Sequence, residues 1–115
     1  MHRVLIVDDS KVARVALGRL LARDGSELEV VGVAGSADEA RAEAHALGPD
    51  LITMDVELAG HDGVALCREL LGLVRTRVVV VTGVSPRDPD LLFRSLAAGA
   101  LDVLPKPSGA ASAAP

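Results

Sequence analysis

The sequence predicts an α/β fold in which a doubly wound, five-stranded parallel sheet lies between helices. Short apolar runs alternate along the chain with segments whose apolar residues recur at helical spacing, which is the pattern of strand–helix–strand units. The 115 residues are enough for one domain with a substantial core. Half of the residues are hydrophobic but only Phe93 is aromatic, so the core must be built from Val, Leu, Ile and Ala.

Five apolar runs are predicted to be strands, at residues 4–7, 29–34, 50–55, 77–82 and 100–105. The run 77–82 is the clearest, because it holds four consecutive valines and β-branched residues favour strands. Gly32 and Pro105 indicate edge positions for the second and fifth strands. Glycine weakens a strand interior, and proline lacks the N–H that a central strand needs.

Four helices are predicted between the strands, each with a start or stop signal. The second begins with a capping box, Ser36 with Glu39 three residues later. The fourth begins at Asp88 and Pro89, and proline favours the first helical position. Cys67 and Phe93 are expected to be buried on the third and fourth helices. The expected spans are Ser10 to Gly25, Ser36 to Gly48, Val64 to Leu73 and Asp88 to Gly99.

Short right-handed crossovers predict the flavodoxin-like strand order 2-1-3-4-5. This order leaves the second and fifth strands at the edges, in agreement with Gly32 and Pro105. Residues 1–107 are expected to form the domain. Residues 108–115 have no apolar stripe, so a flexible tail or the start of an interdomain linker is expected there.

Polar side chains follow the apolar strands at their carboxyl ends, where ligands bind in open α/β sheets. They are Asp8 and Asp9 after the first strand, Asp55 on the third, Thr82 on the fourth and Lys106 after the fifth. In the predicted order the first and third strands are neighbours, so we expect the three carboxylates to meet at one edge of the sheet.

Three close carboxylates repel one another unless a cation lies between them, and Mg²⁺ prefers oxygen ligands of this kind. With Mg²⁺ and Lys106 to neutralise its oxygens, a phosphoryl group could be bound here. A carboxylate can itself be the nucleophile and form an aspartyl phosphate. Asp55 is the candidate acceptor, because the adjacent pair Asp8 and Asp9 is better placed to bind the metal.

Two residues of the fourth strand end complete the predicted site. Thr82 could donate its hydroxyl to the phosphoryl group, and Gly83 after it leaves room for the phosphate. A plainer interpretation stays open, in which Asp8, Asp9 and Ser10 merely cap a helix, Thr82 ends a strand and Lys106 is a solvated surface residue.

Several motifs, in order along residues 3–107, resemble the receiver domain of two-component response regulators. They are Asp8-Asp9-Ser10, Asp55, Asp62-Gly63, Thr82-Gly83 and Lys106-Pro107. Within that family, residues 7–10, 49–57 and 99–103 look most like the receiver of chemotaxis protein-glutamate methylesterases.

The resemblance implies that a histidine kinase phosphorylates Asp55 and that an output domain or partner protein responds. It implies a Mg²⁺ site made by Asp9, Asp55 and the backbone carbonyl of Glu57, with Asp8 acting through water. Lys106 would bind the phosphate and Thr82 would be the switch hydroxyl. A cis peptide bond is implied between Lys106 and Pro107. No enzymatic activity beyond self-phosphorylation and dephosphorylation is expected, and a methylesterase domain would lie outside this chain.

Three departures from the family pattern affect how a signal would leave the site. Val103 stands where the family usually has an aromatic residue that reports phosphorylation. Ala59 and His61 replace the usual Pro and Met in the loop after Asp55. Family members usually end with a fifth helix, which residues 108–115 are not expected to form. Either the chain is part of a longer protein, or a partner, such as a second copy in a homodimer, covers the sheet face that is left open.

Composition excludes several other classes of function. A net charge of −4, scattered arginines and a single aromatic residue argue against nucleic-acid binding. No apolar run approaches the roughly 20 residues of a membrane span. One cysteine excludes an internal disulfide, and a cytoplasmic location is expected. Two alternatives stay open: a phosphorylation-independent docking module, and a Mg²⁺-dependent phosphohydrolase that forms an aspartyl phosphate.

Overall fold

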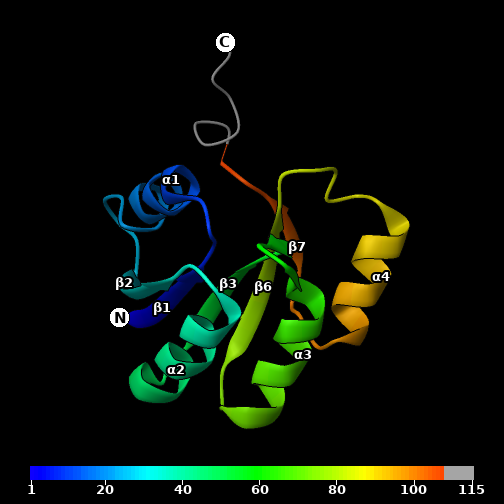
Figure 1. Cartoon of the computed structure of the whole chain (residues 1–115). Coiled ribbons are helices and arrows are strands. Elements are labelled where there is room, and N and C mark those ends of the chain that lie inside the picture. The colour runs from blue at the N-terminus through cyan, green and yellow to red at the C-terminus, as the bar shows by residue number, and fades with distance from the viewer. Residues whose placement is uncertain (108–115) are drawn as a thin grey trace.

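A computed structural model describes residues 1–107 and shows a five-stranded parallel sheet in the order β2-β1-β3-β6-β7 (Figure 1). The strands are β1 (His2–Val7), β2 (Leu28–Ala34), β3 (Leu51–Asp55), β6 (Arg77–Thr82) and β7 (Val103–Pro105). The helices of the described part are α1 (Lys11–Leu21), α2 (Ala37–Leu47), α3 (Gly63–Leu73) and α4 (Pro89–Ala97). The predicted doubly wound α/β fold and its strand order are therefore confirmed. The predicted tail, residues 108–115, lies outside the described residues.

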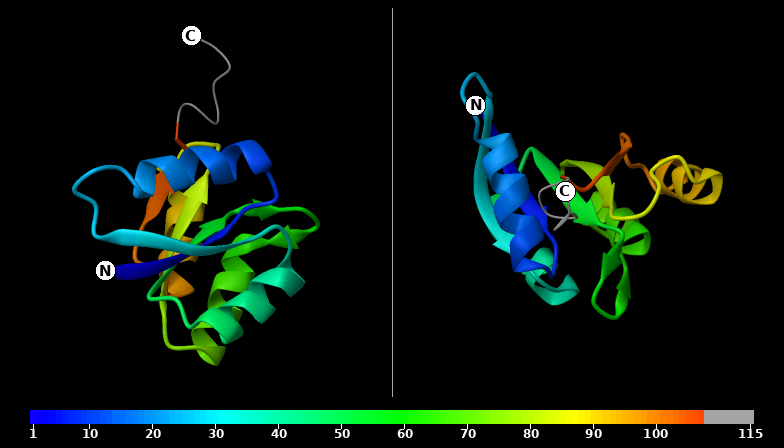
Figure 2. Two further views of the ribbon diagram at one scale, coloured as in Figure 1. Left: turned by 90° about the vertical axis from the view of Figure 1, so that its left-hand side faces the viewer. Right: turned by 90° about the horizontal axis from the view of Figure 1, so that it is seen from above.

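The main core lies between the sheet and the helices α2, α3 and α4. Successive side chains of a strand point to opposite faces, so Leu5 and Val7 join Ile52 and Met54 on one face. Alanines of α2 allow that helix to lie close to the strands. The opposite face, with Val4 and Ile6, carries α1 (Figure 2). Helices on both faces explain why the central strands are continuous apolar runs.

Both predicted edge strands lie at the edges of the sheet. In β2, the register against β1 shifts between Val4, which pairs with Val30, and Leu5, which pairs with Gly32. A side-chain carbon on Gly32 would lie 2.6 Å from Leu47 Cδ1, so the glycine permits a close approach of α2. Pro105 pairs with Thr82 on the outermost strand β7, where no further strand needs its missing N–H.

Two helix starts follow the predicted capping pattern. The hydroxyl of Ser10 accepts from the N–H of Ala13 at 3.2 Å. The hydroxyl of Ser36 accepts from the N–H of Glu39 at 3.1 Å, and the Glu39 carboxylate accepts in turn from the N–H of Gly35 at 2.7 Å. The Glu39 bond thus reaches one residue further back than in a standard capping box, and it ties the β2–α2 turn to the first turn of α2.

Several predicted details of the elements are wrong. Helix α1 ends at Leu21 rather than near Gly25, and β7 begins only at Val103. A two-stranded antiparallel hairpin, β4 (Glu57–Leu58) with β5 (His61–Asp62), occupies a segment that was predicted to be a loop. Asp88 precedes α4 without a side-chain capping bond.

Of the two side chains expected to be buried on helices, one is buried. Cys67 lies in the core, and burial raises the pKa of its thiol to about 11. Phe93 is 74% exposed, against the prediction, because Leu91 and Ser95 supply the face of α4 that meets the sheet. A short amphipathic helix can bury only one stripe, and Phe93 lies outside it.

The outer face of α1 is apolar and exposed in the described part of the chain. Val12, Val15 and Leu20 all have more than two-fifths of their surface accessible, and Leu104 of β7 is similarly exposed. Within residues 1–107, α1 is the helix on this face of the sheet (Figure 2). None of the described helices combines the length and the apolar character that a membrane span requires.

Candidate functional site

Three carboxylates meet at the carboxyl edge of the sheet. Asp8, Asp9 and Asp55 each offer an oxygen within 4.8 Å of the others. The register explains why: Val7 pairs with Met54, so the residues that follow each of them come side by side where β1 and β3 end. Asp8 and Asp55 are both 3% exposed, whereas Asp9 is open to solvent.

Backbone N–H groups hold each of these carboxylates in place. Asp8 Oδ1 accepts from the N–H of Ser10 at 2.9 Å, and Asp55 Oδ1 accepts from the N–H of Glu57 at 3.2 Å. Asp9 Oδ2 accepts from the N–H of Ala59 at 3.0 Å, which ties the acidic pair to the tip of the β4–β5 hairpin. One oxygen of each carboxylate is thus oriented by the backbone.

The Lys106 ammonium lies between the two buried carboxylates. Its Nζ is 3.2 Å from Asp8 Oδ2 and 3.4 Å from Asp55 Oδ1, and its side chain is 18% exposed. The N–H of Lys106 donates to the Thr82 carbonyl at 2.9 Å, which continues the β6–β7 pairing and aims the side chain at the cluster. Burial alone would lower the pKa of Lys106, but the Asp55 and Asp8 carboxylates outweigh it and raise that pKa.

Asp55 is the most perturbed carboxylate of the cluster. Burial first, and then the nearby Asp8 charge, raise its pKa to about 6 against the opposing effects of the Glu57 N–H and Lys106. One lysine therefore does not fully compensate the carboxylates. The Asp55 side chain would be stabilised in its charged form by a further cation.

Thr82 and Gly83 lie beside this cluster, at the end of β6. Thr82 is buried, and its hydroxyl accepts from the N–H of Val84 at 3.0 Å. Val81 pairs with Asp55, so Thr82 follows directly on the neighbouring strand. A side-chain carbon on Gly83 would meet only Lys106 Cδ, at 3.9 Å, so the surface above Gly83 is open.

The Asp62-Gly63 motif joins α3 to the strand that carries Asp55. Asp62 Oδ1 accepts from the N–H of Val64 at 2.9 Å and so caps α3. A side-chain carbon on Gly63 would lie 1.9 Å from the Asp55 carbonyl oxygen, so only glycine permits this backbone approach. The Asp62-Gly63 motif is visible in the sequence, but the need for glycine at position 63 comes from the contact between the start of α3 and the end of β3.

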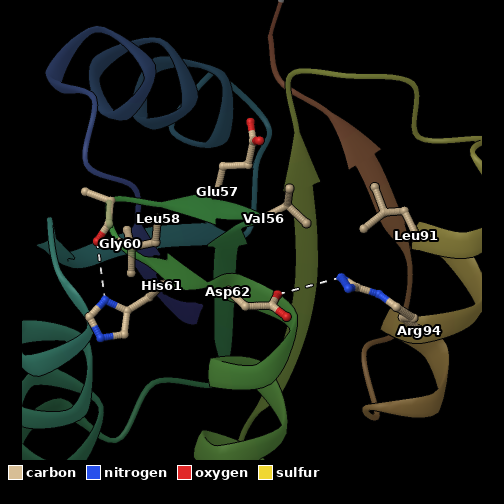
Figure 3. A pocket seen from close by; sticks show the side chains of 9 residues that line it. Val56, Glu57, Leu58, Gly60, His61, Asp62, Leu91 and Arg94 are labelled. Atoms are coloured by element: carbon tan, nitrogen blue, oxygen red, sulfur yellow. Dashed lines mark hydrogen bonds and ion pairs between the residues drawn. The ribbon is translucent and has the colours of Figure 1, made fainter.

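A pocket of about 600 Å³ lies between the β4–β5 hairpin and α4 (Figure 3). An ion pair spans it, with Arg94 Nη2 3.7 Å from Asp62 Oδ1. His61 is exposed and its Nδ1 lies 3.3 Å from the Ala59 carbonyl oxygen, so it belongs to the hairpin rather than to the acidic cluster. The contact of Arg94 with Asp62 has no signal in the sequence, because α4 and the hairpin meet only in the folded chain.

The peptide bond between Lys106 and Pro107 is not cis, against the prediction. Residues 1–107 contain no cis peptide bond. The trans form is the more stable one by about 0.5–1 kcal/mol even before proline, and Lys106 reaches both carboxylates with the trans bond.

Five parallel strands in the order β2-β1-β3-β6-β7, with an acidic cluster and a lysine at their carboxyl edge, are the features expected of a receiver domain. The chain belongs to the family described as response regulator receiver domain, whose sequence pattern matches residues 4–113. The family resemblance predicted from the motifs is therefore confirmed.

Within the family, its relatives include protein-glutamate methylesterases. One is protein-glutamate methylesterase/protein-glutamine glutaminase 3 of Anaeromyxobacter dehalogenans (strain 2CP-C), 44% identical over 97% of this chain. The chain spans only 32% of that relative's length. The response regulator domain of Thermotoga maritima CheB superposes with a TM-score of 0.86 at 33% identity, covering 98% of this chain and 84% of that one.

A further solved relative is a response regulator protein from Burkholderia pseudomallei with a phosphorylated aspartic acid, a calcium ion and citrate. It is 30% identical, with a TM-score of 0.77, over 93% of this chain and 61% of that chain.

Proposed function

We propose that this receiver domain accepts a phosphoryl group on Asp55 from a histidine kinase, with Mg²⁺ bound beside it. The position of Lys106 carries the proposal, because its ammonium reaches from the end of edge strand β7 to contact both Asp55 and Asp8. A cation aimed at two buried carboxylates would neutralise a phosphoryl group attached to one of them. The phosphorylated aspartic acid in the Burkholderia relative supports the same chemistry.

The residues around Asp55 fit a magnesium ion. All three side chains offer oxygen, and burial together with the Asp8 charge raises the pKa of Asp55, so a cation bound there would favour its charged form. Asp9, Asp55 and the Glu57 backbone carbonyl would hold the ion, with Asp8 acting through water. When bound, the ion would neutralise oxygens of the incoming phosphoryl group and bring it in line with the carboxylate.

In the transfer step an Asp55 carboxylate oxygen forms the new bond to phosphorus as the donor's bond to phosphorus breaks. Lys106 pairs with the phosphoryl oxygens as they leave the donor. The Thr82 hydroxyl accepts from the Val84 N–H. Rotation of the Thr82 side chain would let this hydroxyl donate to the phosphoryl group instead. That change would free the Val84 N–H and alter the β6–α4 loop.

The test is phosphorylation by acetyl phosphate and Mg²⁺, read by intact mass. Wild type should gain one phosphate, and Asp55→Asn should gain none. Asp50→Asn is the matched control, since Asp50 precedes the same strand at its other end. A wild-type chain without an adduct would refute the proposal and favour the phosphorylation-independent docking module. Turnover of unrelated phosphate esters would instead favour the phosphohydrolase.

We also infer an output partner and a cytoplasmic location, which the resemblance to chemotaxis regulators supports. The relatives combine a region like this chain with about twice as much further sequence, so a methylesterase output is part of the proposal rather than a property of these residues. In an assay, phosphorylation of Asp55 should change the activity of a methylesterase domain that is supplied with this chain.

The apolar outer face of α1 suggests a place for association, and a second copy of the chain is the expected occupant. Val12, Val15 and Leu20 form its apolar stripe. Sedimentation velocity should show a concentration-dependent dimer that Val15→Glu abolishes. A monomer at all concentrations would exclude the homodimer.

A further inference from the structure

Arg14 of α1 reaches back to the strand end that carries the acidic pair. Its Nη1 donates to the Asp8 backbone carbonyl oxygen at 3.0 Å. The backbone N–H of Arg14 donates to the Ser10 carbonyl at 3.0 Å, which is the first hydrogen bond of the helix. Side chains on a helix point towards its N-terminus, so a residue in this position of α1 is the one able to cover the β1–α1 turn.

A glycine makes room for the Arg14 guanidinium. A side-chain carbon on Gly35 would lie 2.7 Å from Arg14 Nη1, which is closer than real contacts allow. Gly35 is itself held, because its N–H donates to Glu39 Oε1 at 2.7 Å. Arg14 therefore lies in a slot formed by the ends of β1 and β2, with a cavity of about 430 Å³ beside it that Glu39 and Glu43 also line.

The position of the Arg14 guanidinium is unfavourable for the stability of α1. Positive charge near a helix N-terminus opposes the helix dipole, and the first turn of α1 has no acidic residue to offset it. Within residues 1–107, no carboxylate oxygen lies within 4 Å of the Arg14 guanidinium. Its direct polar partner is the carbonyl of the residue that heads the acidic pair.

The bond from Arg14 completes the support of Asp8. The N–H of Asp8 donates to the Ala34 carbonyl at 2.9 Å, and its carboxylate is held by the Ser10 N–H and by Lys106. The carbonyl is the remaining backbone group, and it belongs to the peptide unit that joins Asp8 to Asp9. Rotation of that peptide unit would swing the Asp9 carboxylate away from Asp55.

We propose that Arg14 is a positioning residue of the acidic cluster. By fixing the Asp8–Asp9 peptide unit, it keeps the carboxylates of both residues within reach of Asp55, and its nearby charge offsets part of their repulsion. The inference rests on the proposed function, in which this cluster binds Mg²⁺. It assigns to α1 an indirect part in metal affinity, through a residue outside the predicted ligand set.

The experiment is a calorimetric Mg²⁺ titration of the 115-residue chain, with thermal unfolding of each variant in EDTA alongside. Arg14→Met should raise the Kd for Mg²⁺ about tenfold, the lower end of what loss of an outer support for metal ligands produces. Arg14→Lys, which keeps the charge but not the planar fork, should recover part of the affinity. A merely structural role would lower the melting temperature in EDTA and leave the Kd unchanged.

Gly35→Ala tests the same contact from the other side. Its methyl group should displace the guanidinium, so the Kd should rise as in Arg14→Met, and adding Gly35→Ala to Arg14→Met should raise it no further. Gly18→Ala is the matched control, since a side-chain carbon on Gly18 meets nothing within 4 Å.

The outcomes separate the inference from the proposed function. Wild type that binds no Mg²⁺ overturns the proposed function. Wild type that binds Mg²⁺ while Arg14→Met and Gly35→Ala leave the Kd within twofold overturns the inference alone. If Arg14→Met does not fold, Gly35→Ala and Arg14→Lys decide the question by the same criterion.

Discussion

Lys106 Nζ lies 3.4 Å from Asp55 Oδ1, although the two residues are far apart in the sequence and lie on strands that are not adjacent. The lysine follows edge strand β7 and reaches past β6 to the end of β3. The contact joins the one cation of the cluster to its most perturbed carboxylate. Both the chemistry and the pH response of the site depend on this pair.

Removal of the lysine should impair phosphorylation more than folding. Lys106→Met should slow phosphorylation by acetyl phosphate by about 100-fold, since loss of one well-placed charge donor at a developing anion has effects of that order. Mass spectrometry over time measures the rate. Lys106→Arg, which retains the charge, should lose less, and equal rates for wild type and Lys106→Met would contradict the role of Lys106.

Because the pKa of Asp55 is raised, the metal-free protein should be less stable at pH 7 than near pH 4. Between the ordinary value of 3.8 and about 6, the folded state binds more protons at Asp55 than the unfolded state does. Stability contributed by this group therefore falls as pH rises from about 4 to about 6. At 1.36 kcal/mol per pKa unit the effect is at most about 3 kcal/mol, and solvent screening reduces it.

Asp55→Asn removes this titration, so in EDTA it should be more stable than wild type at pH 7 and should approach wild type near pH 4. Urea unfolding across this pH range measures the difference. Asp24→Asn, a change at an exposed loop carboxylate, is the control and should follow wild type throughout. A constant difference between Asp55→Asn and wild type at all pH values would exclude a raised pKa.

Magnesium should stabilise the folded chain through the acidic cluster. At a concentration 100 times its Kd, a ligand that binds only the folded state adds about 2.7 kcal/mol, which calorimetric melting with and without EDTA would detect. Asp9→Asn should remove most of this gain. Asp38→Asn, at an exposed carboxylate on α2, should keep it, and a gain that survives Asp9→Asn would place the metal elsewhere.

Two glycines of α3 should respond in opposite ways to alanine. Gly63→Ala should destabilise the fold by more than about 2 kcal/mol, because the methyl group would overlap the Asp55 carbonyl. Gly72→Ala should stabilise it by about 0.5–1 kcal/mol, since nothing lies within 4 Å and alanine favours helices. Urea unfolding gives both values, and similar effects for the two changes would contradict the close approach of α3 to β3.

The exposure of Phe93 predicts that the one aromatic residue is dispensable for folding. Phe93→Ser should change the free energy of unfolding by no more than about 0.5 kcal/mol. Leu91→Ala, on the buried side of the same helix, should cost about 2–5 kcal/mol. A large loss for Phe93→Ser would mean that its side chain is covered in solution.

Local sequence patterns were sufficient to predict the strands that are buried on both faces. The central strands are buried on both faces, so residues 4–7 and 78–81 are apolar throughout, and the strands that contain them were correctly predicted. On α4, where one stripe is buried, the sequence could not decide which of the neighbouring apolar residues faces the sheet. Phe93 was predicted to be buried because it is aromatic, but α4 is rotated so that the Phe93 side chain faces solvent.

The β4–β5 hairpin and the short β7 were missed because their causes are not local. The hairpin pairs only two residues on each side, too few for a pattern, and the Ala59 N–H at its tip donates to Asp9. Strand β7 starts late because pairing with β6 begins at Val103. The predicted cis bond before Pro107 came from the family resemblance and had no local signal.

The sequence by itself determined the strand order and the residue types at the strand ends, because alternating strand and helix segments with short crossovers allow few topologies. From these it brought Asp8, Asp9, Asp55, Thr82 and Lys106 to one edge. Only the tertiary structure decided how they are held: Lys106 between two carboxylates, Gly63 against the Asp55 carbonyl and Arg14 over Gly35. Such contacts join segments distant in the chain, and they depend on distances of a few ångströms that no local pattern encodes.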